Sequence, residues 1–325
     1  LVFGGSSGCL RFLPDPKAAE RFFEFFTAHI RNKNTRRAYY KAVCRFADWC
    51  EEKGLLDLSQ VRPMHVAAYV EALTGDLAKP TVKQQLAALR MLFDWLVVGQ
   101  VMDVNPAHSV RGPKHVVKKG RTPVLDREEA RALLGKIVVS QKILLEDGAE
   151  KEEPVLVGLR DRALIGTMIF TFARVGAVLK MNVSDYFTQG RRGWVRLDEK
   201  GGKAHEAPCH HKLEGFLDEY IASAGIGNDQ DGPLFLTTGQ LTGTAHRMTQ
   251  PDAYRMIQRR AKEAGIKTKI GNHSLRATGI TDYLKSEGTL EHAQIMANHS
   301  SPRTTKLYDR RSDETSLDEY ERIGI

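Results

Sequence analysis

The sequence predicts a mainly α protein with two parts, an N-terminal helical bundle and a C-terminal, mostly helical domain with a small three-stranded antiparallel sheet. Apolar residues recur at steps of three and four along most of the chain, which is the spacing of one helix face. Alternation typical of strands is confined to the middle of the second part. The chain has 325 residues, 42% of them hydrophobic, so each part can bury a core.

The composition favours a polyanionic partner. Lys and Arg number 48 against 40 Asp and Glu, which leaves a formal net charge of +8. The four cysteines lack the spacing of a metal site or a disulfide framework and are interpreted as reduced core thiols. No run approaches the roughly 18 apolar residues of a membrane span, and the first residues lack a signal-peptide pattern. We expect a folded, soluble, intracellular protein without a membrane partner.

Residues 16–104 are predicted to form a bundle of helices. Residues 1–15 before them are expected to be a flexible N-terminal segment, either a cloning remnant or a trimmed end. One helix follows a candidate N-cap, Asn34, and another begins after Pro80. Polar faces rich in Arg and Lys suit a binding module better than an active site. The helical spacing covers Pro16 to Ile30, Tyr39 to Cys50, Pro63 to Leu73 and Val82 to Leu96.

Residues 105–122 are predicted to be a basic linker between the two parts. Pro106, Gly112 and Pro113 interrupt the helical spacing. From Arg111 to Arg121 there are five basic residues and no acid. A solvated tether is one interpretation, and a strap lying on phosphate groups is the favoured one.

Residues 123–325 are predicted to form the second domain. A helix begins at the acidic run near Asp126, and a charged, mobile insertion is expected near Leu145 to Glu153. Strands are expected at Val183 to Phe187, Trp194 to Leu197 and Ala204 to Cys209, with Gly201-Gly202 turning the second strand back. Further helices are expected at Leu159 to Thr171, Lys212 to Ser223, Gln250 to Ala264, His273 to Lys285, Leu290 to Asn298 and Leu317 to Ile323.

Several polar residues of this domain point to phosphate chemistry. His273 and Arg276 stand three apart at a helix start, where both can face one anion. Arg174 lies in an apolar stretch and is costly to bury unless an anion meets it. Tyr308 follows His299 by nine residues in a basic setting, NHSSPRTTKLYDRR, that core packing explains poorly. A histidine and an arginine at this spacing are a weak signal alone. Their combination with Arg174, His299 and Tyr308 in this order makes the signal more specific.

The ordered set Arg174, Lys200, His273, Arg276, His299 and Tyr308 resembles the tyrosine recombinase family, the phage-integrase type of site-specific recombinase. The resemblance covers nearly the whole chain from about residue 16. It implies that residues 16–104 are the core-binding, DNA-binding domain, ending before Asn105-Pro106-Ala107. It also implies that residues 123–325 are the catalytic domain, with a C-terminal tail at residues 309–325.

By resemblance, Tyr308 attacks the scissile phosphate and forms a 3′-phosphotyrosine and a free 5′-hydroxyl, while Arg174 and Arg276 hold the phosphate. Lys200 would protonate the departing 5′-oxygen, with Lys203 as the alternative lysine. The resemblance assigns acid–base work to His273 and a hydrogen bond to a non-bridging oxygen to His299.

No metal, ATP or other cofactor is expected. Two guanidinium groups can stabilise the charge that a metal ion stabilises in other phosphoryl transfers. The sequence has no carboxylate cluster suited to Mg²⁺ and no P-loop. His210-His211 is interpreted as a surface pair, because no second cluster at ligand spacing accompanies it.

The expected partner is double-stranded DNA carrying specific recombination sites. By resemblance the two domains close around the duplex and four subunits assemble on DNA, exchanging C-terminal tails between subunits. Such a protein would be cytoplasmic in a bacterium and associated with the nucleoid when bound. The residues expected to touch DNA phosphates are Arg36, Arg37, Lys41, Lys83, Arg111, Lys114, Lys118, Lys119 and Arg121.

The sequence departs from the family pattern at three places. Ala177 stands where an acid is frequent, which leaves open what orients Arg174. Ala297-Asn298 replaces the usual Leu-Gly, and Ala277, after Arg276, stands where histidine is frequent.

Two alternative functions stay open, a type IB-like topoisomerase and a non-catalytic DNA-binding protein of the same fold. Tyr320 is a weaker candidate nucleophile because its neighbours are acidic. The DNA site and the host element, mobile or chromosomal, are not determined.

Overall fold

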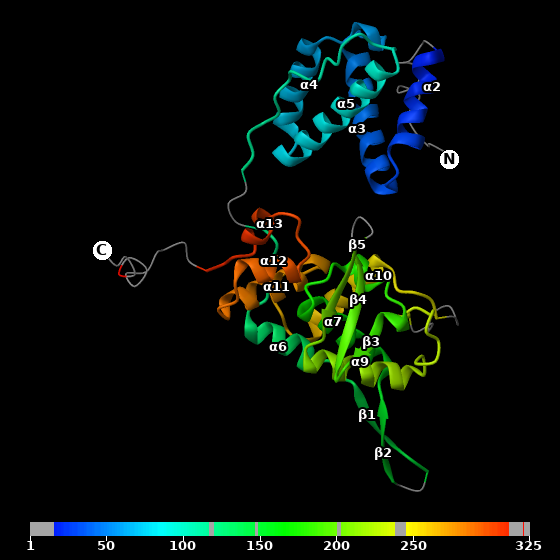
Figure 1. The fold of residues 1–325 in the computed structure, drawn as a ribbon, viewed down its shortest axis with the longest axis vertical. Coiled ribbons are helices and arrows are strands. Elements are labelled where there is room, and N and C mark those ends of the chain that lie inside the picture. Colours follow the sequence, from blue (N-terminus) through cyan, green and yellow to red (C-terminus); the bar gives the residue numbers. More distant parts are fainter. Residues whose placement is uncertain are drawn as a thin grey trace. The chain divides into compact units, whose positions relative to one another are not determined.

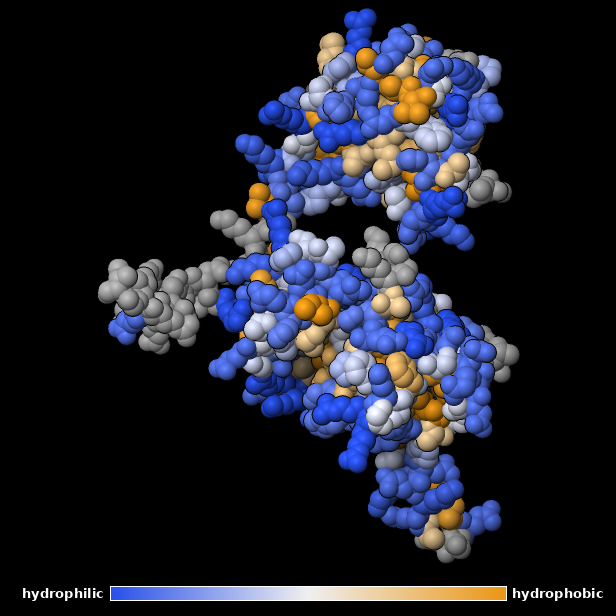
Figure 2. All heavy atoms as spheres, viewed as in Figure 1, coloured by the Kyte–Doolittle hydropathy of each residue, from blue (hydrophilic) through white to orange (hydrophobic). Residues whose placement is uncertain are grey.

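The computed structural model describes residues 16–116, 120–146, 149–199, 203–237, 245–311 and 321. The chain divides into two compact units, Leu1–Val116 and Val117–Ile325, and the division falls within residues 105–122 (Figure 1). Figure 2 shows hydrophilic residues over much of the visible face of each unit. In the described ranges, no helix is long and apolar enough to cross a membrane.

The first unit is a helical bundle around an aromatic core. The ring of Phe46 meets the rings of Tyr69 and Phe93 edge to face, at centroid distances of 5.0 and 6.1 Å. Trp49 packs against this core, as the helical spacing indicates. The elements are α2 (Pro16–Glu24), the π-helical turn η1 (Phe25–His29), α3 (Lys33–Glu52), the 3₁₀ turn η2 (Leu58–Gln60), α4 (Pro63–Asp76) and α5 (Lys79–Val98).

Helix α3 begins two residues earlier than expected, so the prediction of Asn34 as its N-cap is wrong. The Asn32 side chain accepts hydrogen bonds from the backbone N–H groups of Asn34 and Thr35, at 3.0 and 3.1 Å. Asn32 has an extended backbone, as an N-cap requires, whereas Asn34 is already helical. Both residues are asparagine, and only the backbone conformation distinguishes them.

The second unit is built around the buried helix α7 (Leu156–Phe170). This helix is buried along most of its length and packs against α9 (His211–Ala224) and α11 (Asn272–Lys285). Gly279 of α11 permits the close approach of α7, because a Cβ atom there would lie 2.1 Å from the carbonyl oxygen of Ile169. The remaining helices are α6 (Arg127–Gly135), α8 (Val175–Val178), α10 (Gln250–Glu263), α12 (Leu290–Met296) and α13 (Pro302–Lys306).

A three-stranded antiparallel sheet lies in this unit, which confirms the sheet that the sequence predicts. Its strands are β3 (Tyr186–Gln189), β4 (Arg192–Glu199) and β5 (Lys203–Pro208), in the order β3-β4-β5. The expected first strand starts late, because Val183–Asp185 form the 3₁₀ turn η3. In β4, buried and exposed positions alternate, and the buried face ends at Glu199.

The charged insertion contains regular structure that the sequence did not predict. Strands β1 (Ser140–Leu144) and β2 (Glu150–Pro154) form a second, two-stranded antiparallel sheet. Across it, Lys142 contacts Glu150 at 2.6 Å. Both strands are mostly exposed, so they carry no alternating apolar pattern that would reveal them.

Candidate active site

Arg276 is the most tightly held of the candidate residues. It lies on α11, its side chain is 3% exposed, and its guanidinium donates hydrogen bonds to the carbonyl oxygens of Phe172 and Ala297. The Nη2–oxygen distance to Ala297 is 2.5 Å. A guanidinium anchored in this way has a fixed direction, which suits it to bind an anion at one place.

Both anchoring carbonyl groups lie at left-handed backbone turns. Phe172 has φ of 55°, and Asn298, which follows Ala297, has φ of 45°. Asparagine tolerates this region better than most residues, which explains how Asn298 can stand where the family pattern has glycine. A bulky Phe in this region is strained, and the hydrogen bond from Arg276 helps to hold it.

Arg174 lies beside a buried carboxylate that the sequence pattern does not single out. Its Nη1 donates to Oε2 of Glu199, and its backbone N–H donates to Oε1 of Glu199 at 3.4 Å. The Glu199 side chain is 3% exposed, whereas that of Arg174 is 35% exposed. Arg174 caps the N-terminus of α8, which packs next to β4. Glu199 and Arg174 are 25 residues apart, so no local pattern connects them.

His299 and Tyr308 lie side by side next to Arg276. Their rings are nearly parallel, with a centroid distance of 5.7 Å and an angle of 11°. Tyr308 also lies near enough to Arg276 to influence the pKa of that arginine. His299 is 7% exposed, and its Nδ1 lies 2.9 Å from Oγ1 of the fully buried Thr305. The fold therefore brings Arg174, Arg276, His299 and Tyr308 into one cluster.

Burial and positive charge shape the electrostatics of this cluster. Burial, followed by the charge of Arg174, lowers the pKa of Arg276 to about 10, so its guanidinium stays charged at neutral pH. Burial, followed by the charges of Arg276 and Arg174, lowers the pKa of His299 to about 4. His299 is therefore neutral near pH 7 and can serve as a hydrogen-bond donor without adding charge.

The backbone around Tyr308 is held from two sides. The hydroxyl of Thr281, on α11, donates to the Tyr308 carbonyl oxygen at 2.9 Å. The N–H of Gly120 donates to the carbonyl oxygen of Leu307, also at 2.9 Å. Arg310 donates to the carbonyl oxygen of Thr122 at 3.0 Å. The end of the basic linker thus contacts the segment that carries the tyrosine.

The structure describes only some of the other candidate residues. His273 is exposed in the first turn of α11, one turn before Arg276. Lys200 lies outside the described residues, and Lys203 begins β5. Tyr320 and most of the predicted terminal helix also lie outside them. In the described part of the chain, no group of His, Cys, Asp and Glu side chains has the arrangement of a metal site.

Among the basic residues expected to touch DNA, one is engaged within the bundle and the other described ones are exposed. Arg36 donates two hydrogen bonds to the carbonyl oxygen of Ile30, so its guanidinium is engaged within the bundle. Arg37 and Lys41 are exposed one turn apart on α3, and Arg45 continues their row. The i, i+4 spacing could have revealed Arg45. The other exposed residues of the predicted set are Lys83, Arg111, Lys114 and Arg121, while Lys118 and Lys119 lie outside the described residues.

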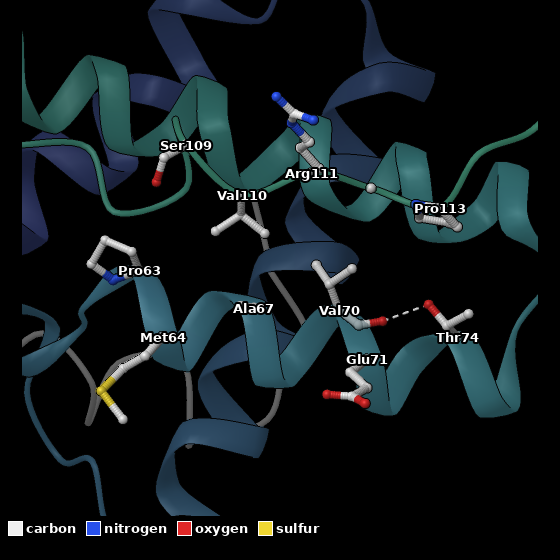
Figure 3. Close-up of a pocket in the computed structure, with 11 residues that line it drawn as sticks. Pro63, Met64, Ala67, Val70, Glu71, Thr74, Ser109, Val110, Arg111 and Pro113 are labelled. Atoms are coloured by element: carbon white, nitrogen blue, oxygen red, sulfur yellow. Dashed lines mark hydrogen bonds between the residues drawn. The ribbon is translucent and has the colours of Figure 1, made fainter.

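A shallow, largely apolar groove lies in the first unit, between α4 and the start of the basic linker (Figure 3). Val70 points toward it from α4 and Val110 from the linker, and Met64 also lines it. None of the candidate catalytic residues lines this groove. The exposed Arg111 also lines it, and Arg90 holds this part of the linker on the bundle by donating to the carbonyl oxygens of Ala107 and Val110.

Curated relatives match most of the chain. Tyrosine recombinase XerD of Mycobacterium leprae is 27% identical over 285 residues, which cover 85% of this chain and 86% of the relative. Tyrosine recombinase XerC of Vibrio parahaemolyticus is 27% identical over 299 residues, which cover 90% of this chain and 87% of the relative.

Solved structures share the fold. The XerH site-specific recombinase, in a post-cleavage complex with a palindromic difH substrate, has a TM-score of 0.68 at 18% identity, covering 97% of this chain and 94% of that one. A lambda integrase dimer bound to a COC′ core site has a TM-score of 0.64 at 17% identity, covering 92% and 79%. At these identities the likeness establishes the architecture.

Two family models match the sequence itself. The model of the phage integrase family matches residues 149–315, the range that includes every candidate catalytic residue. The model of the phage integrase N-terminal SAM-like domain matches residues 19–102, the helical bundle. The chain therefore belongs to the phage integrase family, the family of the tyrosine recombinases.

Proposed function

We propose that this protein is a site-specific DNA recombinase that cuts and rejoins DNA through a 3′-phosphotyrosine at Tyr308, without metal or ATP. The observation that carries the proposal is the cluster of Tyr308, Arg276 and Arg174. The ring of Tyr308 lies against that of His299, and both arginines are close enough to lower the pKa of His299. A phosphate placed among these three side chains meets a nucleophile and two guanidiniums at once.

In the cleavage step, the Tyr308 oxygen attacks phosphorus and the bond from phosphorus to the 5′-oxygen breaks. The products are a 3′-phosphotyrosine and a free 5′-hydroxyl, so the phosphodiester energy is conserved. Arg174 and Arg276 bind the non-bridging oxygens, on which negative charge increases in the transition state. Rejoining is the reverse step with a second strand's 5′-hydroxyl.

Proton transfers use the remaining residues. His273 accepts the proton of the Tyr308 hydroxyl, which its exposed position at the start of α11 allows. Lys200, or Lys203 as the alternative, gives a proton to the departing 5′-oxygen. His299 donates a hydrogen bond to a non-bridging oxygen, and its low pKa keeps it neutral in that role.

The partner is duplex DNA that carries the recombination sites. The bundle of residues 16–104 and the basic linker, residues 105–122, bind phosphates, and residues 123–325 perform the chemistry. The XerH recombinase that shares this fold is bound to its difH substrate, and a lambda integrase tetramer is bound to a Holliday junction. We propose the same assembly here, four subunits with exchange of the tail around Leu317 to Ile323.

Covalent trapping tests the proposal. DNA sites are first selected from a randomised duplex library by binding to the Tyr308→Phe protein, and are then built as nicked suicide substrates. Wild-type protein, Tyr308→Phe and the control Tyr320→Phe are incubated with them in EDTA and separated under denaturing conditions. We expect a denaturant-resistant adduct from wild type and Tyr320→Phe, and none from Tyr308→Phe.

Each of the other possible results would point to a different nucleophile or a different function. An adduct from Tyr308→Phe that disappears with Tyr320→Phe would move the nucleophile to Tyr320. No adduct from wild type despite tight, salt-sensitive binding would favour a non-catalytic DNA-binding protein. An adduct without strand exchange between two duplexes would favour a type IB-like topoisomerase.

A further inference from the structure

The two guanidiniums of the candidate site need a counter-charge before any phosphate arrives. Arg174 and Arg276 are close enough that the charge of Arg174 lowers the pKa of Arg276. Two cations this close together repel each other when no anion lies between them, and the more exposed side chain can turn toward solvent. That side chain is Arg174, which is 35% exposed, whereas Arg276 is fixed by two carbonyl groups.

One carboxylate supplies the counter-charge. Oε2 of Glu199 accepts from Nη1 of Arg174, and Oε1 lies 3.7 Å from Nη1 of Arg276. Oε1 also accepts from the backbone N–H of Arg174 at 3.4 Å. Glu199 thus contacts both the backbone and the side chain of Arg174, which restricts the rotamers of that arginine.

The strand geometry explains why Glu199 reaches this place. Val195 and Leu197 point into the core at alternate positions of β4, and Glu199 continues the same buried face at the strand end. There β4 packs next to α8, whose N-cap is Arg174. An isolated carboxylate buried to this degree is costly, so its persistence here requires its cationic neighbours.

The short helix α8 does not supply an acid of its own. Ala177, three residues after Arg174, is 4% exposed and has no polar side-chain atom. Apart from Glu199, the described residues show no carboxylate paired with the Arg174 side chain. The counter-charge therefore comes from the neighbouring strand and not from the helical turn that begins at Arg174.

We infer that Glu199 is a positioning residue for the strand-transfer reaction, which aims Arg174 at the scissile phosphate and holds the two arginines together in the free enzyme. The inference rests on the proposed function. Glu199 does not touch the substrate; it acts through Arg174. An incoming phosphate meets the side of the arginine pair that Glu199 leaves open.

The test compares Glu199→Gln, which keeps the shape and removes the charge, with the wild type and with Glu206→Gln. Glu206 lies on the adjacent strand β5 and pairs at 3.0 Å with the exposed Arg196, so it is a matched control. Adduct formation on a suicide substrate is measured in single turnover, together with DNA affinity and the melting temperature. We expect Glu199→Gln to cut at least about tenfold more slowly with DNA affinity within about twofold of wild type, and Glu206→Gln to match wild type.

A double-mutant cycle separates positioning from general packing. In an Arg174→Lys background the side chain at position 174 keeps its charge and loses the planar guanidinium that Glu199 orients. The substitution Glu199→Gln should therefore slow cleavage by a much smaller factor than it does in the wild-type background. An equal loss in both backgrounds, or a wild-type rate for Glu199→Gln, would overturn the inference. If Gln at position 199 prevents folding, Glu199→Asp replaces it, since a carboxylate one methylene shorter should also slow cleavage more than twofold.

Failure of the proposed function gives a different result. In that case the wild type itself forms no adduct on its selected DNA. The Arg174 side-chain N–H resonance in the DNA-free protein then tests the contact alone, and an unchanged resonance in Glu199→Gln would overturn the positioning role.

Discussion

Single side chains in the candidate site depend on neighbours that limit their charge or their rotation. Glu199 balances Arg174, two carbonyl groups fix Arg276, and Thr305 holds the ring of His299 through Nδ1. Each of these contacts prepares a group before the substrate is bound. Preorganisation of this kind lowers the reorganisation that a transition state would otherwise require.

His299 should give the protein a measurable pH dependence of stability. Its pKa is about 4 in the folded protein against an ordinary value of 6.5. Between these values the unfolded chain binds the proton more readily, so the free energy of unfolding falls as the pH is lowered from about 6.5 to 4. Replacement by glutamine, His299→Gln, removes this contribution.

Urea unfolding at pH 7 and pH 4.5 measures the effect. We expect the wild type to lose more stability between the two values than His299→Gln does. The exposed His292 is the control, and His292→Gln should keep the wild-type dependence. Equal pH dependence in wild type and His299→Gln would show that His299 is not held neutral.

Elements, rather than residues, decide where Tyr308 lies. The tyrosine follows α13, a short helix that packs on α12, and α12 packs on α11 (Figure 1). The end of the linker adds a contact, because Gly120 approaches the carbonyl group of Leu307 closely. A Cβ atom at position 120 would lie 2.5 Å from that oxygen, so only glycine fits without movement.

The substitution Gly120→Val should therefore displace the tyrosine segment. We expect adduct formation to slow about tenfold or more, because displacements on the order of 1 Å are costly in a preorganised site. Gly135→Val is the control, since a Cβ atom at Gly135 meets nothing within 4 Å. Single-turnover trapping of both variants is the measurement, and equal rates would mean that the linker contact does not position Tyr308.

At the scale of the whole molecule, the exposed basic row and the candidate catalytic cluster lie in different units. The bundle presents the exposed row of Arg37, Lys41 and Arg45 on α3, whereas the candidate catalytic cluster lies entirely in the second unit. A basic row separate from the nucleophile is suited to contacts with phosphates that are not cut. Loss of affinity and loss of cleavage should therefore be separable by mutation.

The double variant Arg37→Ala/Lys41→Ala should weaken DNA binding similarly for all sequences. Each cation removed from a DNA phosphate should reduce the slope of log affinity against log salt by about 0.9, so the double variant should reduce it by about 1.8. Lys151→Ala is the control, because Lys151 lies on the acidic hairpin and pairs with Glu153. Titrations at several salt concentrations measure the slope, and an unchanged slope in the double variant would remove α3 from the DNA-binding surface.

The sequence alone determined the mainly helical class, the three-stranded sheet and the order of chemical groups that marks the family. These features are encoded locally, by apolar spacing within a helix or by residue types in a motif. The tertiary structure decided the pairing of Glu199 with Arg174, the left-handed turn at Asn298 and the contact of Gly120 with Leu307. Each joins or shapes segments through packing, and neither a carboxylate at a strand end nor a glycine in a linker specifies its distant partner. The hairpin β1–β2 also emerged only in three dimensions, because exposed charged strands carry no periodic signal.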